Sequence, residues 1–84
     1  MLWEMISFVN RAKNRKLVLF KLAKPTTPTA LAKELHLHRS VVSRALLDLE
    51  KKELVICLNP GSRKERYYKL TKKGEDIKKK IEKM

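Results

Sequence analysis

Apolar positions in the first third of this 84-residue chain recur at helical spacing. Leu17, Phe20 and, with Val18, Leu22 precede Pro25 at this spacing, so the pattern predicts a helix over residues 10–24 that the proline ends. The apolar stretch before this helix fits a separate turn or strand, or an extension of the helix.

A second helix has a well-marked start. Thr27 is suited to accept a hydrogen bond from a free amide as the N-cap, and Pro28 then occupies the first helical position, where no N–H is needed. The helix is short and is expected to end near His36. Its predicted apolar face consists of Leu31, Ala32 and Leu35.

The third predicted helix covers residues 39–53 and has two distinct faces. One face is apolar and consists of Val42, Ala45, Leu46 and Leu49. The other carries Ser40, Ser43, Arg44, Leu47 and Lys51. Its N-terminal half contains Arg39 and Arg44 but no acid, whereas the acids all lie in its C-terminal half. A helix that enters a DNA major groove by its N-terminal end needs this polarity.

A β-hairpin is expected after the third helix. Residues 54–58 and 66–70 are prone to form strands, and a turn around Pro60 and Gly61 separates them. The hairpin tip is basic, with Arg63, Lys64 and Arg66. A final helix follows, which Thr71 is expected to cap, and its narrow apolar stripe consists of Ile77, Ile81 and Met84.

Together these elements predict one α+β domain over residues 1–84, mainly α with a small β-hairpin. Two helices joined by a tight turn form a helix-turn-helix, and the basic hairpin makes it a winged one. The expected architecture is a three-helix core, a wing and a C-terminal helix, with residues 1–9 and 75–84 as flanking segments.

The charge balance indicates a polyanionic partner, which is nucleic acid first and an anionic membrane surface second. The formal net charge is +12, and a hydrophobic content of 43% is too high for a disordered chain of this charge. Residues 1–24 carry a net +5, residues 25–58 a net +1 and residues 59–84 a net +6. A nearly neutral centre between basic flanks is typical of a DNA-binding protein, because phosphate contacts outside the base-reading element supply affinity.

Cys57 is the single cysteine of the chain, which excludes an internal disulfide and fits a reducing compartment, so a cytoplasmic location is expected. No segment approaches the ~20 apolar residues of a membrane span. The N-terminus lacks the basic start and long apolar stretch of a signal peptide.

Several motifs resemble those of winged helix regulators. Residues 27–35, TPTALAKEL, resemble the opening TPSELAKEL of many such proteins, and residues 38–50, HRSVVSRALLDLE, resemble their recognition helix SRSTVSRHLRELE. The sequences CLNP at 57–60 and YKLTKKG at 68–74 resemble the wing of archaeal members. Over residues 15–74 the chain is therefore similar to the MarR/ArsR-like winged helix superfamily. That resemblance implies a transcription regulator that binds double-stranded DNA.

The chain departs from the superfamily pattern at two helix ends and in the wing. His36 and Glu53 stand where glycine is usual, at positions that often need a positive φ, so the helices are expected to end differently here. The Asp-x-Arg signature of typical MarR wings is absent. Residues 62–66 stand in its place, so the role of that wing-tip arginine is not assigned to one residue.

The predicted DNA-binding residues come from the start of the second helix, the outward face of the third helix and the wing. Contact with DNA is favoured over a merely solvated helix face for Ser43 and Arg44, because the fold places this face outward. Leu47 either touches a thymine methyl group or packs on the wing. The full set is Thr27, Thr29, Arg39, Ser40, Ser43, Arg44, Leu47, Arg63, Lys64 and Arg66.

Other chemistry finds little support in the sequence. His36, His38 and Cys57 do not form the converging cage that zinc needs, so no metal is expected. No cofactor is expected either, and the absence of a nucleophile–base pair, paired carboxylates or a glycine-rich phosphate loop argues against an enzyme. The alternative function is a winged helix module that binds protein or RNA. Against it stand the retained charge and the small number of aromatic residues free to stack on bases.

The apolar ends predict a homodimer. Leu2, Trp3 and Ile6 make the first residues more apolar than a free terminus should be, and the stripe of the last helix offers a seam for a partner helix. In the alternative, the N-terminal residues fold back onto the first helix and the chain is a monomer.

Overall fold

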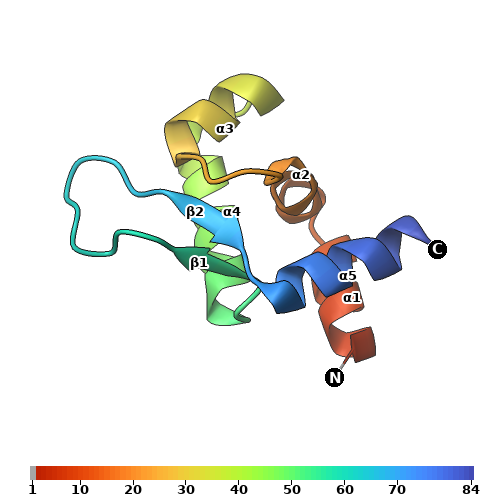
Figure 1. Cartoon of the computed structure of the whole chain (residues 1–84). Coiled ribbons are helices and arrows are strands. Elements are labelled where there is room, and N and C mark those ends of the chain that lie inside the picture. Colours follow the sequence, from red (N-terminus) through yellow and green to blue (C-terminus); the bar gives the residue numbers. More distant parts are fainter. Residues whose placement is uncertain (1) are drawn as a thin grey trace.

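The computed structural model describes residues 2–84 and consists of five helices and a two-stranded hairpin (Figure 1). The expected class, mainly α with a small β-hairpin, is confirmed. In chain order the elements are α1 (Leu2–Asn10), α2 (Lys13–Lys21), α3 (Pro28–Leu35), α4 (Arg39–Lys51), β1 (Val55–Cys57), β2 (Tyr68–Leu70) and α5 (Lys72–Glu82). Met1, the first residue of the predicted flank 1–9, lies outside the described residues.

The helix predicted over residues 10–24 is α2, which is shorter at both ends, and the apolar stretch before it forms a separate helix, α1, in place of a turn, a strand or an extension. α1 ends at Asn10, and α2 begins after Ala12, whose backbone is extended. Of the predicted apolar positions, Val18 and Leu22 are buried and Phe20 packs against the core, whereas Leu17 is 37% exposed. The buried residues of this region are Val18, Leu19 and Leu22. Four consecutive apolar residues, 17–20, leave the phase of the helix open in the sequence, and packing against α4 selects the phase.

The start of α3 agrees with the prediction. Thr27 Oγ1 accepts a hydrogen bond from the Ala30 amide at 3.2 Å, and Pro28 is the first helical residue. α3 ends at Leu35, directly before His36 as expected. Leu31 and Ala32 are buried, whereas Leu35 packs at the margin of the core.

α4 buries the apolar face that the sequence predicts and ends two residues earlier than expected. Val42, Ala45, Leu46 and Leu49 are all buried. His36 and Glu53, which follow α3 and α4, have φ values of 56° and 62°. The expectation that these helices end differently from glycine-terminated ones is therefore wrong. Both residues adopt the left-handed backbone conformation although they carry a side chain. This conformation is strained for residues other than glycine.

The hairpin is shorter than predicted, because its two strands are limited to the three residues that pair. β1 and β2 are antiparallel, with Val55 opposite Leu70 and Cys57 opposite Tyr68. On its other side Tyr68 forms a bridge with Thr26, through amide–carbonyl bonds of 2.8 and 3.1 Å in the two directions. The hairpin is thereby attached to the segment that leads into α3.

α5 is fixed to the turn that follows α4. Thr71 caps the helix, as predicted, by accepting from the Gly74 amide at 3.0 Å, and its hydroxyl donates to the Glu53 carbonyl at 2.7 Å. The Thr71 amide donates to the Leu54 carbonyl at 3.1 Å. The turn that precedes the wing and the start of α5 are thus held together by one backbone bond and one bond from the Thr71 hydroxyl.

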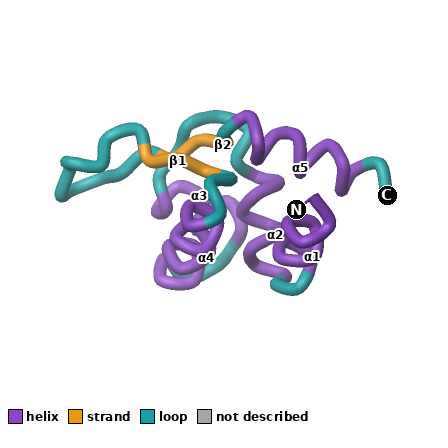
Figure 2. The backbone as a smooth tube through the Cα atoms, turned by 90° about the horizontal axis from the view of Figure 1, so that it is seen from below, coloured by secondary structure: helices purple, strands orange, loops and turns teal. Residues whose placement is uncertain are grey.

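The predicted seam for a partner helix is mostly used within the chain. Ile77 and Ile81 of α5 are buried in the same core as Ile6 and Val9 of α1, and α1 contacts α5. The proposed dimer stripe is therefore wrong for the two isoleucines, although Met84 is 69% exposed. Figure 2 shows α1, α2 and α5 gathered at one end of the molecule, with the β1–β2 loop extending from the other end.

Candidate nucleic-acid interface

α4 presents a polar ridge on the side opposite its buried face. Arg39, Ser40 and Arg44 are exposed, Leu47 is 48% exposed, and Ser43 is half-buried. The ridge is free of acidic residues from its start to Leu47. The four buried residues on the other face fix the rotation of the helix, so the ridge cannot turn inward without exposing the core.

Two grooves border this ridge, one on each side of α4. The groove between α4, the start of α3 and the wing measures about 390 Å³, and the groove between α4 and the start of α2 measures about 700 Å³. Ser43 lines both grooves. Of the predicted residues, the wing-side groove contains Thr27, Thr29, Arg39, Ser43, Arg63, Lys64 and Arg66. The α2-side groove contains Ser40, Ser43, Arg44 and Leu47.

The wing-side groove is strongly basic. Four cationic side chains line it, Arg39 from α4 and three from the wing, and Glu65 is the acid among its lining residues. Thr27 contributes little free hydrogen-bonding capacity, because it is 7% exposed and its hydroxyl caps α3. Thr29 is half-exposed beside it. Leu47 lies on the α2 side of α4, in the groove that the wing does not line.

The wing loop has an internal scaffold that sequence reasoning missed. Asn59 Nδ2 donates to the Glu65 carbonyl at 2.8 Å, and Asn59 Oδ1 accepts from the Tyr67 amide at 2.7 Å. Arg66 Nε also donates to the Ser62 carbonyl at 3.3 Å. The side-chain amide of Asn59 therefore makes the pair of hydrogen bonds that a strand backbone would make, and it closes the loop. The Asn-Pro-Gly sequence signals a turn here, but it does not reveal the cross-loop partners.

Tyr68 anchors the base of the wing in an apolar environment. It is 5% exposed, and it pairs with Cys57 of β1 on one side of β2 and with Thr26 on the other side. Burial raises the pKa of the Tyr68 hydroxyl above its ordinary value of 10.0; proximity to Cys57 and Glu50 adds to the rise, and Arg66 opposes it. Tyr68 thus connects the core to Arg66 of the wing.

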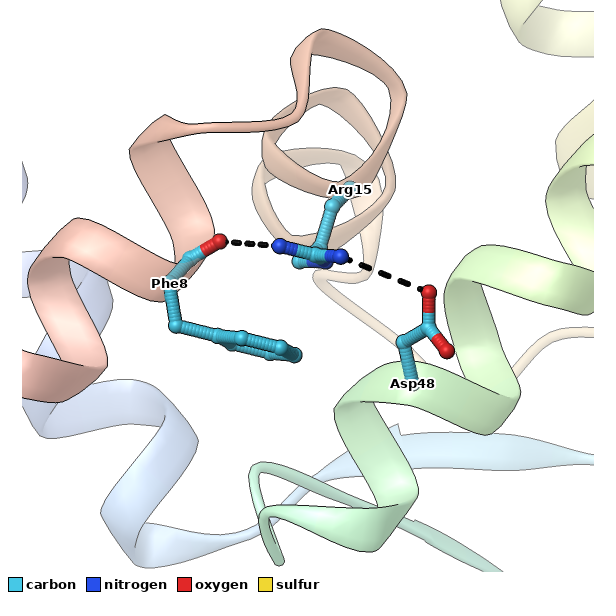
Figure 3. Close-up of polar contacts among 3 residues, drawn as sticks. All are labelled: Phe8, Arg15 and Asp48. Atoms are coloured by element: carbon cyan, nitrogen blue, oxygen red, sulfur yellow. Dashed lines mark hydrogen bonds and ion pairs between the residues drawn. The ribbon is translucent and has the colours of Figure 1, made fainter.

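Arg15, a residue that the sequence does not point to, lines the α2-side groove. Figure 3 shows its side chain between Phe8 and Asp48. Its guanidinium lies 3.8 Å from the centroid of the Phe8 ring and donates to the Phe8 carbonyl. Its Nη2 atom lies 3.5 Å from Asp48 Oδ2. No local pattern reveals this contact, because Arg15 and Asp48 are 33 residues apart.

The residues considered for metal binding do not converge. His36 and His38 are exposed on either side of the α3–α4 turn, whereas Cys57 is buried in β1. Across residues 2–84 the structure contains no group of three or more His, Cys, Asp or Glu side chains that could hold an ion. Over the same residues, every helix is too short or too polar to span a bilayer.

No protein family model and no curated protein matches the chain. Solved structures do match. RV1404 from Mycobacterium tuberculosis is 28% identical with a TM-score of 0.77, over 93% of this chain and 57% of that one. The adhesin competence repressor AdcR from Streptococcus pyogenes is 22% identical with a TM-score of 0.74, over 86% and 54%. FabT from Streptococcus pneumoniae, solved in complex with DNA, is 21% identical with a TM-score of 0.68, over 98% and 64%.

AdcR is a repressor by name, FabT is bound to DNA in its structure, and one of the further matches is a zinc-responsive member of the MarR family; these structures share the winged helix fold. The predicted winged helix fold is therefore confirmed. The chain spans between about half and two thirds of the length of the three solved structures described above.

Proposed function

We propose that this chain is a transcription regulator that binds double-stranded DNA sequence-specifically, with α4 in the major groove and the wing on the phosphate backbone. The observation that carries the proposal is the acid-free ridge of α4 between two grooves, with the cationic wing facing one of them. The neighbours that share the fold include the repressor AdcR and the DNA-bound FabT, and they support the same class of function.

The ridge of α4 suits base reading. The B-DNA major groove is about 12 Å wide and admits a single α-helix, whose outward side chains can then reach base edges. Arg44 projects from the middle of the ridge, and a bidentate arginine is the commonest specific contact to guanine. Leu47, on the same ridge, is suited to contact a thymine methyl group.

The wing and the start of α3 suit phosphate contacts. Arg63 and Lys64 are exposed in the β1–β2 loop, and this loop projects from the body of the molecule (Figure 1). Phosphate contacts position a protein on the duplex but carry no sequence information directly. The net charge of +12 supplies the long-range attraction for such contacts.

One selection experiment tests this assignment. Random duplexes are selected on the protein in the presence of an RNA competitor, and the preferred duplex is then measured against random duplex. We expect enrichment of a defined DNA motif. A preference for the RNA competitor, or no enrichment, would contradict the proposal and would favour an RNA- or protein-binding module.

Variants separate the roles of the two surfaces. Arg44→Ala should weaken binding to the preferred site more than binding to random duplex, by about 1–3 kcal/mol. Arg63→Ala and Lys64→Ala should weaken both about equally, because phosphate contacts are independent of sequence. Lys80→Ala serves as the control, because it removes one charge at an exposed position of α5 that lines neither groove. The reverse pattern would assign sequence reading to the wing.

We also propose that the chain forms a homodimer through its two ends. Leu2, Trp3 and Met84 are 43%, 71% and 69% exposed, and Trp3 and Met84 line one hollow of about 700 Å³. A two-fold dimer would set two copies of α4 about 34 Å apart and require a near-palindromic site. Light scattering checks the solution state, since a mass near 9.9 kDa would exclude a stable dimer.

The single cysteine favours the cytoplasm as the place of this function. The likeness to archaeal members of the superfamily rests on the wing sequence.

A further inference from the structure

An acidic residue stands at the end of the ridge proposed to read DNA. Asp48 follows Arg44 by one helical turn and lines the same groove, together with Ser40 and Leu47. A carboxylate at this place has two unfavourable effects on DNA binding. It repels the phosphates of the duplex, and it competes for Arg44, because side chains four residues apart on a helix are neighbours that form ion pairs.

The structure resolves this conflict by giving Asp48 a different partner. Arg15 Nη2 lies 3.5 Å from Asp48 Oδ2, and the two side chains are 18% and 33% exposed. Among residues 2–84 no ion pair joins Arg44 to Asp48, and Arg44 stays exposed on the ridge. The cation that neutralises the carboxylate therefore comes from α2 and not from the ridge itself.

Arg15 is held in place from its other side. Its guanidinium lies over the Phe8 ring at 3.8 Å from the centroid and donates to the Phe8 carbonyl at the end of α1 (Figure 3). A planar guanidinium suits this arrangement because it stacks on an aromatic ring while its N–H groups donate in the ring-parallel plane. The contacts of Arg15 with Phe8 and Asp48 are thus already formed in the protein without DNA.

We propose that Arg15 is a positioning residue for DNA binding. By holding Asp48, it neutralises the carboxylate in the α2-side groove and keeps Arg44 unpaired and available to the duplex. This inference rests on the proposed function, and it adds a residue outside α3, α4 and the wing to the machinery that binds DNA.

A mutant cycle tests the proposal on the full chain. Arg15→Met keeps the length and apolar stem of the side chain but releases Asp48, and Asp48→Asn removes the harmful charge. We expect Arg15→Met to weaken preferred-duplex binding about three- to tenfold at 50 mM salt, the size of losing one or two phosphate contacts. The double variant Arg15→Met/Asp48→Asn should bind within about twofold of the parent, a change of under about 0.5 kcal/mol.

Two controls separate the proposal from simpler effects. Lys80→Met removes the same charge as Arg15→Met at an exposed site on α5 and should cost less affinity. Arg44→Ala should reduce the effect of Arg15→Met, because no arginine is then left for Asp48 to capture. Unfolding midpoints measured by circular dichroism accompany every variant.

The outcomes are distinct. Binding is measured well below the unfolding midpoint of every variant, so that rescue by Asp48→Asn reports recovered duplex affinity and not recovered stability, and such rescue supports the proposal. The proposal is overturned if the double variant binds as weakly as Arg15→Met, or if Asp48→Asn alone weakens binding more than Arg15→Met does. A parent chain that binds no duplex refutes the proposed function itself, which is a different result.

Discussion

The two glycines of the chain stand in opposite environments, and replacing each with alanine should have opposite effects on stability. A Cβ atom at Gly74 would lie 2.0 Å from the carbonyl oxygen of Leu54 and 3.0 Å from its carbonyl carbon. A Cβ atom at Gly61, in the wing, would meet nothing within 4 Å. Neither glycine has a positive φ, so contacts and not backbone strain decide the outcome.

The clash at Gly74 is difficult to relieve. The Leu54 carbonyl already accepts from the Thr71 amide at 3.1 Å, and the neighbouring Glu53 carbonyl accepts from the Thr71 hydroxyl at 2.7 Å. Moving α5 away by the 1 Å or more that alanine requires would stretch both bonds. Overpacking costs about 1–3 kcal/mol, and each strained hydrogen bond adds about 0.5–1.5 kcal/mol.

We therefore expect Gly74→Ala to lower the free energy of unfolding by about 3 kcal/mol, which corresponds to a Tm drop of about 12–24 °C in a domain of this size. Gly61→Ala should raise it by about 0.4–1 kcal/mol, because alanine restricts the unfolded chain. Thermal and urea unfolding followed by circular dichroism measure both changes. Equal midpoints for the two variants would refute the close approach of α5 to the turn after α4.

Three further predictions concern the helix ends, the core tyrosine and the wing. His36→Gly and Glu53→Gly should each stabilise the fold by about 0.5–1 kcal/mol, because relief of the left-handed strain exceeds the entropic cost of glycine; destabilised variants in urea unfolding would contradict this. Because burial raises the pKa of Tyr68 in the folded state, its stabilising contribution is present below pH 10 and is lost as the pH rises through the folded-state pKa, so the free energy of unfolding should fall at alkaline pH. Tyr68→Phe should reduce that slope in a pH series, and an unchanged slope would assign it to other groups. Asn59→Ala removes the two hydrogen bonds that the Asn59 side chain makes to Glu65 and Tyr67, so hydrogen exchange at the Tyr67 amide should accelerate and affinity for preferred and random duplex should fall alike. A loss confined to the preferred duplex would argue against a role in presenting phosphate contacts.

Local chemistry made much of the fold predictable. Thr27 and Thr71 were recognised as N-caps because a hydroxyl residue stood directly before a helical pattern, and both accept the expected amide. The buried face of α4 was predictable because the apolar residues 42, 45, 46 and 49 recur at the helical period within one short segment. The ten predicted DNA-binding residues also line one or other of the two grooves beside α4.

The errors arose where long-range contacts decide between local alternatives. The phase of α2 depends on which of four consecutive apolar residues meets the core, and the burial of Ile77 and Ile81 depends on α1 folding back toward α5. The left-handed residues His36 and Glu53 show that a turn imposed by tertiary packing can override residue preference. Arg15 could not be found from the sequence because its partner in α4 is 33 residues away.

A salt titration of duplex binding tests the central claim most directly. If the ridge of α4 and the basic wing together neutralise about six phosphates, the logarithm of the association constant should fall with the logarithm of the salt concentration with a slope of about −5. Wing variants such as Arg63→Ala should each reduce that slope by about 1. A flat salt response, or no binding to duplex DNA at about 50 mM salt, would contradict the account.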